Sequence, residues 1–423
     1  MNILTEKFGI NEELINLSEK VEESVQEEFK KAEDIAFYNQ VKVLSAMQKY
    51  GLADRHFCKT TGYGYDDIGR EIIENIYTDI FKAEDALVRL QFVNGTHALS
   101  CALFGVLRPG DKVLSINGRP YDTICEVIGI TDEVNPSSLV AMGVKYDEIP
   151  LKDDNFDEEK IVEYLKNNDV KMVIMQRSKG YAWRKSMYID DIESVIKKMK
   201  EVKKDLVVMV DNCYGEFVEE KEPTEVGADL CVGSLIKNLG GGIAEMGSYI
   251  VGRKDLVNLC AERLTCPGIG KECGATLGQN KNILQGLFLA PNVVKEAIKT
   301  AIFASKLLED MGYEVMPRYN EKRSDIIEAI KFNDPDILIK YIQGIQAGSP
   351  VDSDVRPLPW AMPGYVDEVI MAAGTFVQGA SIELSADSPI RPPFVSYMQG
   401  GLTYLSGKIA VLKAAQNIWG NNK

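Results

Sequence analysis

The sequence predicts an α/β protein built on a mostly parallel β-sheet, followed by a second, smaller α/β domain. Two observations support this fold class. Short, continuously apolar runs, such as 205–212 and 228–235, alternate with amphipathic segments of helical spacing. Strands of this kind are buried on both faces, which is typical of parallel sheets. In addition, a long helical segment over 293–315 leads out of the alternating region, and such a helix is a natural domain boundary.

The first predicted elements are helices. Residues 11–49 are rich in Glu and Lys, with apolar residues at helical spacing, and predict a helical N-terminal arm. The apolar segment 96–107 predicts a second helix, because Arg108, Pro109 and Gly110 form a stop signal directly after it. Further helices are predicted at 137–144, 158–168 and 189–204.

The predicted strands alternate with these helices along the chain. Each has a short apolar core bounded by polar residues, and they lie at 111–117, 171–177, 205–212, 228–235 and 246–253. The order of helices and strands divides the chain into three parts. These parts are an N-terminal helical segment (1–85), a large α/β domain (86–290) and a smaller C-terminal α/β domain (291–423).

The composition limits the possible functions. The chain has 48 basic and 63 acidic residues and a net charge of −15, which disfavours nucleic acids and acidic membranes as partners, since both attract basic surfaces. We expect neither a signal peptide nor a membrane-spanning segment of about 20 apolar residues. Eight cysteines without a C-x-x-C pair predict reduced thiols in a cytoplasmic protein. With two histidines in the chain, we expect no His-based metal site.

Two neighbouring apolar strands each place a chemically useful residue at or just beyond the carboxyl end. The first ends at Asp211, and Lys237 follows the second. Functional residues collect at the carboxyl ends of parallel strands. Pyridoxal phosphate requires such a pair: a lysine amine for a Schiff base, and a carboxylate that keeps the pyridine nitrogen protonated so that the ring acts as an electron sink. The sequence therefore predicts a pyridoxal phosphate site at Asp211 and Lys237.

Two further segments predict a phosphate-binding site. Ser234 offers a hydroxyl three residues before Lys237, and the glycines at 240–242 allow close backbone approach. At the start of the apolar helix, Gly95 and Thr96 offer free backbone N–H groups at the positive end of the helix dipole. Each of these residues alone has an ordinary structural explanation, such as a helix cap or a solvated loop, but their combination favours a cofactor site.

Six segments carry a family resemblance. They are FVNGTHALSCALFGVLRPGD (92–111), VDNCYGEFVE (210–219), GSLIKNLGGG (233–242), RLTCPGIG (263–270), QGLFLAP (285–291) and AAGTFVQGASIELSADSPIRPPF (372–394). The chain resembles the fold-type I pyridoxal-phosphate enzymes of cysteine and methionine metabolism, most closely the methionine gamma-lyase-like family often labelled "aluminium resistance protein". The resemblance implies an aspartate aminotransferase-like fold with a mostly parallel seven-stranded sheet, and pyridoxal 5'-phosphate as the cofactor.

The same resemblance implies roles for individual residues of the cofactor site. Lys237 would form the Schiff base and Asp211 would contact the pyridinium nitrogen. Gly95, Thr96 and Ser234 would hold the phosphate.

The resemblance also implies roles for three tyrosines and an arginine around the cofactor. Tyr121, in INGRPYDT (116–123), would stack on the cofactor ring and transfer protons. The segment TTGYGYDDIGRE lies where relatives carry a tyrosine–arginine pair that reaches the phosphate of the neighbouring subunit. Tyr63, Tyr65 and Arg70 are the candidates there, although the spacing of the family is not reproduced.

The implied substrate site includes an arginine. Arg391 would bind the substrate α-carboxylate, because a guanidinium group matches a carboxylate in a bidentate geometry. Arg177 is the competing candidate, since it also follows a predicted strand. The role of His97 stays open between packing on the cofactor and filling space at the helix start.

We therefore expect a lyase that acts on a sulfur-containing amino acid, of the methionine gamma-lyase or cystathionine beta-lyase type. Lys237 would take the α-proton, and elimination would yield a thiol, a 2-oxo acid and ammonia. The resemblance also implies a homo-oligomer, dimer or tetramer, with active sites at subunit interfaces.

Two alternatives remain open at this point. The first is another reaction of the same cofactor, aminotransfer or aldol cleavage, because these reactions use the same lysine and aspartate. The second, from a different class, is an acidic cation-binding protein without enzymatic activity. Nicotinamide and P-loop enzymes are disfavoured, because neither G-x-G-x-x-G at a strand-to-helix turn nor G-x-x-x-x-G-K-[ST] occurs.

Overall fold

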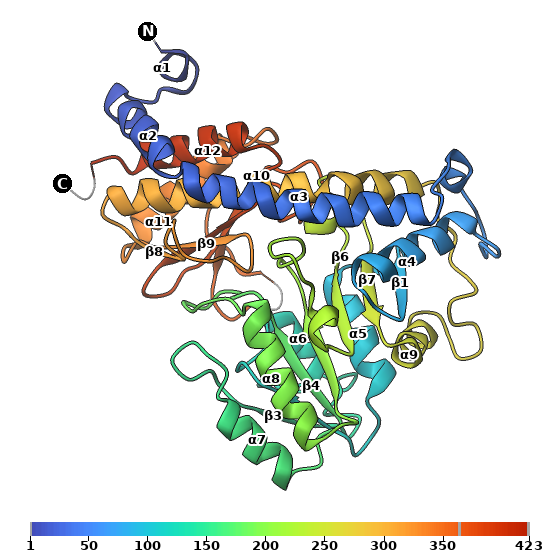
Figure 1. Cartoon of the computed structure of the whole chain (residues 1–423). Coiled ribbons are helices and arrows are strands. Elements are labelled where there is room, and N and C mark those ends of the chain that lie inside the picture. The colour runs from blue at the N-terminus through green and yellow to red at the C-terminus, as the bar shows by residue number, and fades with distance from the viewer. Residues whose placement is uncertain (1, 363–364, 421–423) are drawn as a thin grey trace.

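The computed structural model describes residues 2–362 and 365–420. The chain forms two β-sheets, each surrounded by its own helices (Figure 1). The larger sheet has seven strands in the order β1-β7-β6-β5-β4-β2-β3, and the smaller has five in the order β10-β11-β12-β9-β8. This arrangement confirms the predicted fold class of a seven-stranded α/β domain followed by a smaller α/β domain.

The larger sheet is mostly parallel. Its strands are β1 (Asp85–Arg89), β2 (Lys112–Ser115), β3 (Lys145–Glu148), β4 (Met172–Gln176), β5 (Val207–Asp211), β6 (Leu230–Ser234) and β7 (Ser248–Gly252). Strands β2 to β6 are paired in parallel, whereas β7 is antiparallel to its neighbours β1 and β6. All five predicted strands are confirmed. The sequence did not predict β1 or β3; β3 is short and polar and lies at the edge of the sheet.

Helices cover both faces of this sheet. The helices of this region are α5 (Gly95–Val106), α6 (Asp122–Ile128), α7 (Glu158–Asn167), α8 (Ile189–Val202) and α9 (Lys254–Leu264). Along β4, Met172 and Ile174 pack in one core with α5 and α9, whereas Val173 and Met175 pack in a second core with α7 and α8. Both faces of the strand are therefore buried, which explains its continuous apolar sequence.

One predicted helix of this domain is wrong. Residues 137–144 form turns instead. The backbone N–H groups of Leu139 and Val140 donate to the carbonyls of Val127 and Ile128 at the end of α6, at 3.1 and 2.9 Å. These amides are consequently unavailable to a helix of their own.

The smaller sheet is antiparallel throughout. Its strands are β8 (Glu314–Met316), β9 (Ile327–Lys331), β10 (Val369–Ala372), β11 (Ser385–Pro389) and β12 (Val395–Gln399), and its helices are α11 (Pro335–Ala347) and α12 (Tyr404–Asn417). On the face of the sheet that carries Ile327 and Tyr397, the core also includes Tyr181 and Tyr214 from the large domain. This face of the small sheet is therefore turned toward the large domain.

The remaining helices connect the two halves. They are α1 (Ile3–Phe8), α2 (Glu12–Ser24), α3 (Gln26–Lys49), α4 (Ile68–Ile80) and α10 (Asn280–Asp310), with short 3-10 helices at Asp54–Phe57, Pro223–Val226 and Asn238–Gly240. Figure 1 shows α3 lying along α10 across both halves. None of the helices among the described residues is long and apolar enough to cross a membrane.

Helix α10 begins earlier than predicted. It starts at Asn280, before the expected segment 293–315, continues through Pro291 and ends at Asp310. The predicted domain boundary between residues 290 and 291 therefore falls inside a continuous helix. On the large-domain side, α10 lies with Gly286 against Gly240, where an added Cβ at Gly286 would stand 2.2 Å from the Gly240 carbonyl oxygen. The two backbones are in direct contact.

Candidate active site

The carboxyl ends of β5 and β6 open into a cavity of about 380 Å³ between the two sheets. Asp211 is the last residue of β5 and pairs with Val232 of the parallel strand β6. Ser234 ends β6, and Lys237 follows in the turn after it. All three functional side chains line this cavity. The structure thus brings together the aspartate, serine and lysine that the sequence singled out.

The Asp211 carboxyl group lies deep in the cavity. Its Oδ1 accepts a hydrogen bond from the Cys213 backbone N–H at 3.2 Å. Burial raises the pKa of Asp211 to about 6, although this hydrogen bond and the charge of Lys237 act in the opposite direction. No lysine or arginine of the described residues forms an ion pair with this carboxyl group within 4.0 Å. The protonated pyridine nitrogen of bound pyridoxal phosphate would provide the missing cationic partner.

The Lys237 ammonium group lies over an aromatic ring. Its Nζ is 3.9 Å from the centroid of the Tyr214 ring. Burial alone would lower the pKa of Lys237, but the interactions with Tyr214, Cys213 and Asp211 outweigh burial and raise it. The amine is therefore protonated in the protein without cofactor, and it must lose a proton before it can act as a nucleophile or base.

An anion-binding site lies at the start of α5. The Asn94 side chain accepts from the His97 backbone N–H at 2.8 Å, and the Asn94 carbonyl accepts from Ala98. The N–H groups of Gly95 and Thr96, in the first turn, have no intrahelical partner. Gly95 faces Ser234, whose Cβ would be 3.5 Å from a Cβ added at Gly95. The free amides, the helix dipole and the serine hydroxyl form a donor set that suits a phosphate group.

Together these residues fit pyridoxal phosphate. Asp211 provides an anionic acceptor at one end of the cavity, and the start of α5 provides donors for a phosphate. Lys237 lines the same cavity with a single amine. The chemistry of this donor set matches the three parts of the cofactor: ring nitrogen, aldehyde carbon and phosphate.

Tyr121 lies in the cavity wall directly before α6. Its backbone N–H donates to Gln176 Oε1 at 3.1 Å, and its hydroxyl is hydrogen-bonded to the hydroxyl of Tyr365. The Tyr121 ring meets that of Tyr181 edge-on, with centroids 5.9 Å apart. Burial raises the pKa of Tyr121, so its hydroxyl keeps its proton and can act as a donor.

The candidates for the neighbouring phosphate lie outside this cavity. Tyr63 and Tyr65 stack on each other with centroids 5.5 Å apart, and both are largely exposed, at 73% and 59%. Arg70 is buried instead, and donates to the carbonyls of Gly64, Glu272 and Gly274. Its guanidinium group therefore links the loops that contain these three carbonyls.

The two candidate arginines for the substrate carboxylate differ sharply. Arg391 is exposed beside the cavity, pairs with Asp367 at 2.8 Å and donates to the Tyr181 carbonyl at 3.4 Å. Arg177 is fully buried, does not line the cavity and pairs with Glu219 at 2.9 Å. Neither arginine lines the cavity, and Arg391 is the exposed one of the two. Arg391 remains the candidate.

His97 also lies outside the cavity. Its Nδ1 accepts from the Val93 backbone N–H at 3.1 Å, and its ring meets Phe92 edge-on at 5.7 Å. The imidazole therefore packs against Phe92 at the start of α5.

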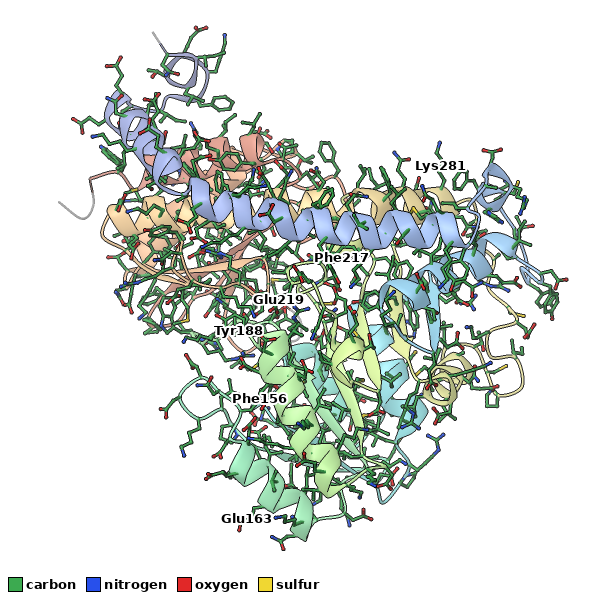
Figure 2. The ribbon with its side chains drawn as sticks, viewed as in Figure 1. Phe156, Glu163, Tyr188, Phe217, Glu219 and Lys281 are labelled. Atoms are coloured by element: carbon green, nitrogen blue, oxygen red, sulfur yellow. The ribbon has the colours of Figure 1, made fainter. Side chains whose placement is uncertain are left out.

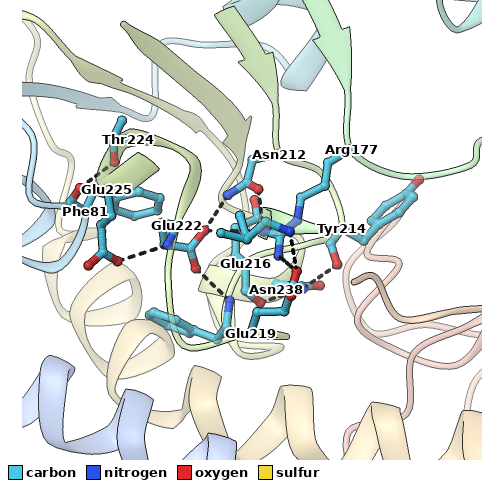
Figure 3. A network of polar contacts seen from close by, with 12 residues as sticks. Phe81, Arg177, Asn212, Tyr214, Glu216, Glu219, Glu222, Thr224, Glu225 and Asn238 are labelled. Carbon is cyan, nitrogen blue, oxygen red and sulfur yellow. Dashed lines mark hydrogen bonds and ion pairs between the residues drawn. The ribbon is translucent and has the colours of Figure 1, made fainter. Parts of the chain in front are cut away.

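A buried polar network surrounds the residues that directly follow Asp211 and Lys237 (Figure 3). Asn212, directly after Asp211, donates to Glu222 Oε2 at 2.8 Å and accepts from Arg177 at 2.8 Å. Asn238, directly after Lys237, donates to the carbonyls of Tyr214 and Glu216, both at 2.9 Å. Both asparagines are fully buried. The network thus ties the residue after each catalytic side chain to one loop, 214–222.

Helix α3 also forms hydrogen bonds to loop 214–222. The Asn39 side chain donates to the carbonyls of Phe217 and Glu219, at 3.2 and 3.1 Å. Figure 2 shows Phe217 and Glu219 lying beneath α3. A Cβ added at Gly215 would stand 2.4 Å from Arg177 Cδ, so the backbone of the loop lies directly on the side chain of Arg177.

Sequence analysis missed the residues that the small domain contributes to the cavity. They are Ile327, Gln378, Gly379, Asp387, Tyr397 and Gln399, and Tyr181 and Tyr214 of the large domain were missed as well. Asp387 lies in the segment SADSPIRPPF, where the only signal was an acidic residue within a strand otherwise made of small residues and proline.

The fold and the site together define a class of enzyme. A mostly parallel seven-stranded sheet that presents a lysine and a carboxylate at the ends of adjacent strands is the arrangement of fold-type I pyridoxal-phosphate enzymes. The family model for methionine gamma-lyase matches residues 14–419, and the chain belongs to this family. It is accordingly a pyridoxal 5'-phosphate-dependent carbon–sulfur lyase.

Similar proteins extend over almost the whole chain. A solved structure from Clostridium novyi NT, named as a carbon-sulfur lyase involved in aluminum resistance, shares 50% identity, covers 98% of each chain and has a TM-score of 0.94. A Clostridium acetobutylicum protein of known structure shares 51% identity over 98% of each chain, with a TM-score of 0.96. The uncharacterized protein YnbB of Bacillus subtilis (strain 168) is 48% identical and covers 94% of this chain and 95% of its own length.

A more distant structure shares the fold. The methionine gamma lyase CalE6 from Micromonospora echinospora has 18% identity and a TM-score of 0.55, and the match covers 81% of this chain and 86% of CalE6.

Proposed function

We propose that the protein cleaves a carbon–sulfur bond in a sulfur-containing amino acid and releases a thiol, a 2-oxo acid and ammonia. The observation that supports this proposal is the convergence of Lys237, Asp211 and the phosphate-binding start of α5 on one cavity, in a chain of the methionine gamma-lyase family. The names of the similar proteins favour this reaction over aminotransfer and aldol cleavage, because they include a carbon-sulfur lyase.

The residues of the chain divide the work as follows. Gly95, Thr96 and Ser234 bind the phosphate of the cofactor, and Asp211 keeps the proton on its ring nitrogen. Bound pyridoxal phosphate supplies an electron sink for negative charge that develops at the substrate α-carbon. Lys237 provides the amine that attaches the cofactor and, once free of it, takes the α-proton.

The leaving group requires a proton donor and the substrate requires an anchor. When the carbon–sulfur bond breaks, its electron pair stays on sulfur, and the Tyr121 hydroxyl donates a proton to form the thiol. Tyr121 suits this role because its hydroxyl is protonated and lines the cavity. Arg391 binds the α-carboxylate at the rim. Water then hydrolyses the unsaturated amine that remains to a 2-oxo acid and ammonia.

We also propose a cytoplasmic homo-oligomer, dimer or tetramer, in which Tyr63 and Tyr65 complete the site of a neighbouring subunit. The position of these two tyrosines supports this proposal, because they form an exposed aromatic pair outside the cavity of their own chain. For the cation-binding alternative, the described residues hold no cluster of three or more His, Cys, Asp or Glu side chains that would bind a metal ion.

The test begins with the visible absorbance spectrum of the purified protein, recorded before and after borohydride and followed by peptide mapping. We expect an absorbing cofactor attached to the peptide that contains Lys237. Release of thiol and 2-oxo acid from methionine, cystathionine and cysteine then identifies the substrate. A protein that pyridoxal phosphate cannot colour, or one that releases no thiol from any of the three, would contradict the proposal.

A further inference from the structure

The small domain forms a distinct wall of the cavity. Strand pairing places Asp387 opposite Tyr397, and Ser385 opposite Gln399, so these side chains share one face of the sheet. Ile327 of β9 is paired with Gln399 and lies on the same face. This face looks across the cavity toward Lys237. The side chains of this face therefore form the wall of the cavity that lies opposite Lys237.

Asp387 is the charged residue among the four side chains that this face contributes to the cavity. Its Oδ2 accepts from Gln399 Nε2 at 3.1 Å, and the Tyr181 hydroxyl also hydrogen-bonds to the carboxyl group. No lysine or arginine of the described chain lies within ion-pair distance of it. Burial raises the pKa of Asp387 to about 6, and Lys237 acts to lower it. A carboxylate in this position lacks a cationic partner.

The surroundings of Asp387 suit a cation. The rings of Tyr181 and Tyr397 are adjacent, with centroids 5.4 Å apart, and both line the cavity beside the carboxyl group. Aromatic faces attract cations, and a carboxylate accepts the N–H donors of an ammonium group. An uncharged methyl thioether offers no charge to this carboxyl group, and would leave it without a cationic partner.

We propose that Asp387 binds an ammonium group on the far side of the scissile carbon–sulfur bond, so that the preferred substrate is a thioether amino acid whose sulfur carries a second, amino-bearing chain. Cystathionine has this chemistry and methionine does not. The inference rests on the proposed function and names the substrate class of that same site. Asp387 is then a residue that determines specificity, whereas Lys237 and Asp211 serve every substrate.

The experiment compares pairs of compounds that differ by one amino group. The holoenzyme is assayed with cystathionine and with the analogue that lacks the distal amino group. Binding is measured separately as the inhibition constants of diaminosuberate, in which methylene replaces sulfur, and aminosuberate, which lacks the distal amino group. The variants are Asp387→Asn, which keeps the shape and removes the charge, and Glu368→Gln, which removes a charge from an exposed side chain on the same domain.

We expect the wild-type enzyme to favour the amino-bearing member of each pair by about tenfold to hundredfold, the size of one hydrogen bond to a charged group. In Asp387→Asn this preference disappears, because kcat/KM falls more for the amino-bearing compound than for the analogue without the amino group. Glu368→Gln keeps the preference. The inhibitor pair tests the inference on the wild-type protein alone, because the two compounds differ only in the distal amino group.

Three results with the compounds named above would overturn the inference. In the first, the wild type shows equal kcat/KM values and equal inhibition constants for both members of each pair. In the second, Asp387→Asn keeps the full preference for the amino-bearing compound. In the third, Asp387→Asn loses the same factor in kcat/KM for all substrates. The last would mean that Asp387 acts on the part that all substrates share. Preference for the sulfonium of S-methylmethionine over methionine, without discrimination of the distal ammonium, would likewise overturn it. Failure of the proposed function is distinguishable, because no compound would then release a thiol.

Discussion

The two walls of the cavity differ in what holds them in place. On the large-domain wall, Asp211 and Lys237 are each followed by a fully buried asparagine that is fixed by the network around Arg177 and Glu222. On the small-domain wall, Asp387 relies on Gln399 and Tyr181. The steps common to every substrate thus lie on the wall with the denser polar support, and recognition lies on the wall with fewer contacts.

The largest expected effect comes from the catalytic wall itself. Lys237→Ala removes both the attachment of the cofactor and the base for the α-proton, so turnover should fall by at least about a thousandfold. The release of thiol and 2-oxo acid measures this loss. Substantial residual lyase activity would contradict the assignment and would end the distinction between the two walls.

A second prediction tests the support behind that wall. Glu222→Ala leaves the buried Arg177 guanidinium with one carboxylate partner fewer, and breaking a buried ion pair from one side costs about 3–5 kcal/mol of unfolding free energy. Urea denaturation measures the change, and Glu220→Ala, an exposed carboxylate in the same loop, is the control. If both variants unfold at the same urea concentration, the network is not the support that we infer.

A third prediction concerns the rim of the cavity. Arg391→Ala should raise KM for amino-acid substrates by about tenfold or more, with a smaller change in kcat, because a charged hydrogen-bonding partner of the carboxylate is lost. Steady-state kinetics measure the two constants, with Arg318→Ala as an exposed control. An unchanged KM would remove this role from Arg391, and the buried Arg177 could not take it over.

The last prediction is a pH dependence of stability. Burial raises the pKa of Glu216 to about 8 from an ordinary value of 4.5, while the Tyr249 hydroxyl donates to it at 2.7 Å. Between these pH values the folded protein holds a proton that the unfolded chain has lost, so this group lowers stability as the pH rises from about 4.5 to about 8. The penalty is complete above pH 8.

Glu216→Gln removes this titration. The variant should match the wild type near pH 5 and exceed its unfolding free energy above pH 8 by up to about 5 kcal/mol. Chemical denaturation at the two pH values measures the difference. A variant that is less stable than the wild type at high pH would show that the carboxylate form is needed in the network.

The sequence predicted the large-domain wall well, for a physical reason. Buried parallel strands have continuous apolar sequences, and Asp211 and Lys237 stand out because each follows such a run. Arg177 follows one as well, but its burial depends on Glu219 and Glu222, which reach it only through tertiary packing. Strand position alone therefore could not separate a residue that faces the cavity from one that faces the core.

The small-domain wall was harder to predict. Asp387, Tyr181 and Tyr214 meet in the cavity because the two domains pack against each other, and no local pattern encodes that packing. The partners of Arg70 could not be predicted for the same reason, since the carbonyls of Glu272 and Gly274 that accept from it lie far away in the sequence.

The contact between Gly240 and Gly286 has a consequence for how this enzyme can change over evolutionary time. Helix α10 meets the turn after Lys237 backbone to backbone at these two glycines, and the same helix packs against β8 and β9 of the small domain. Side chains absorb small changes by adopting other rotamers, but two backbones in contact cannot. New substrate ranges are therefore accessible through substitutions on β11 and β12, whereas substitutions at the glycine contact would disturb the chemistry that all of those substrates share.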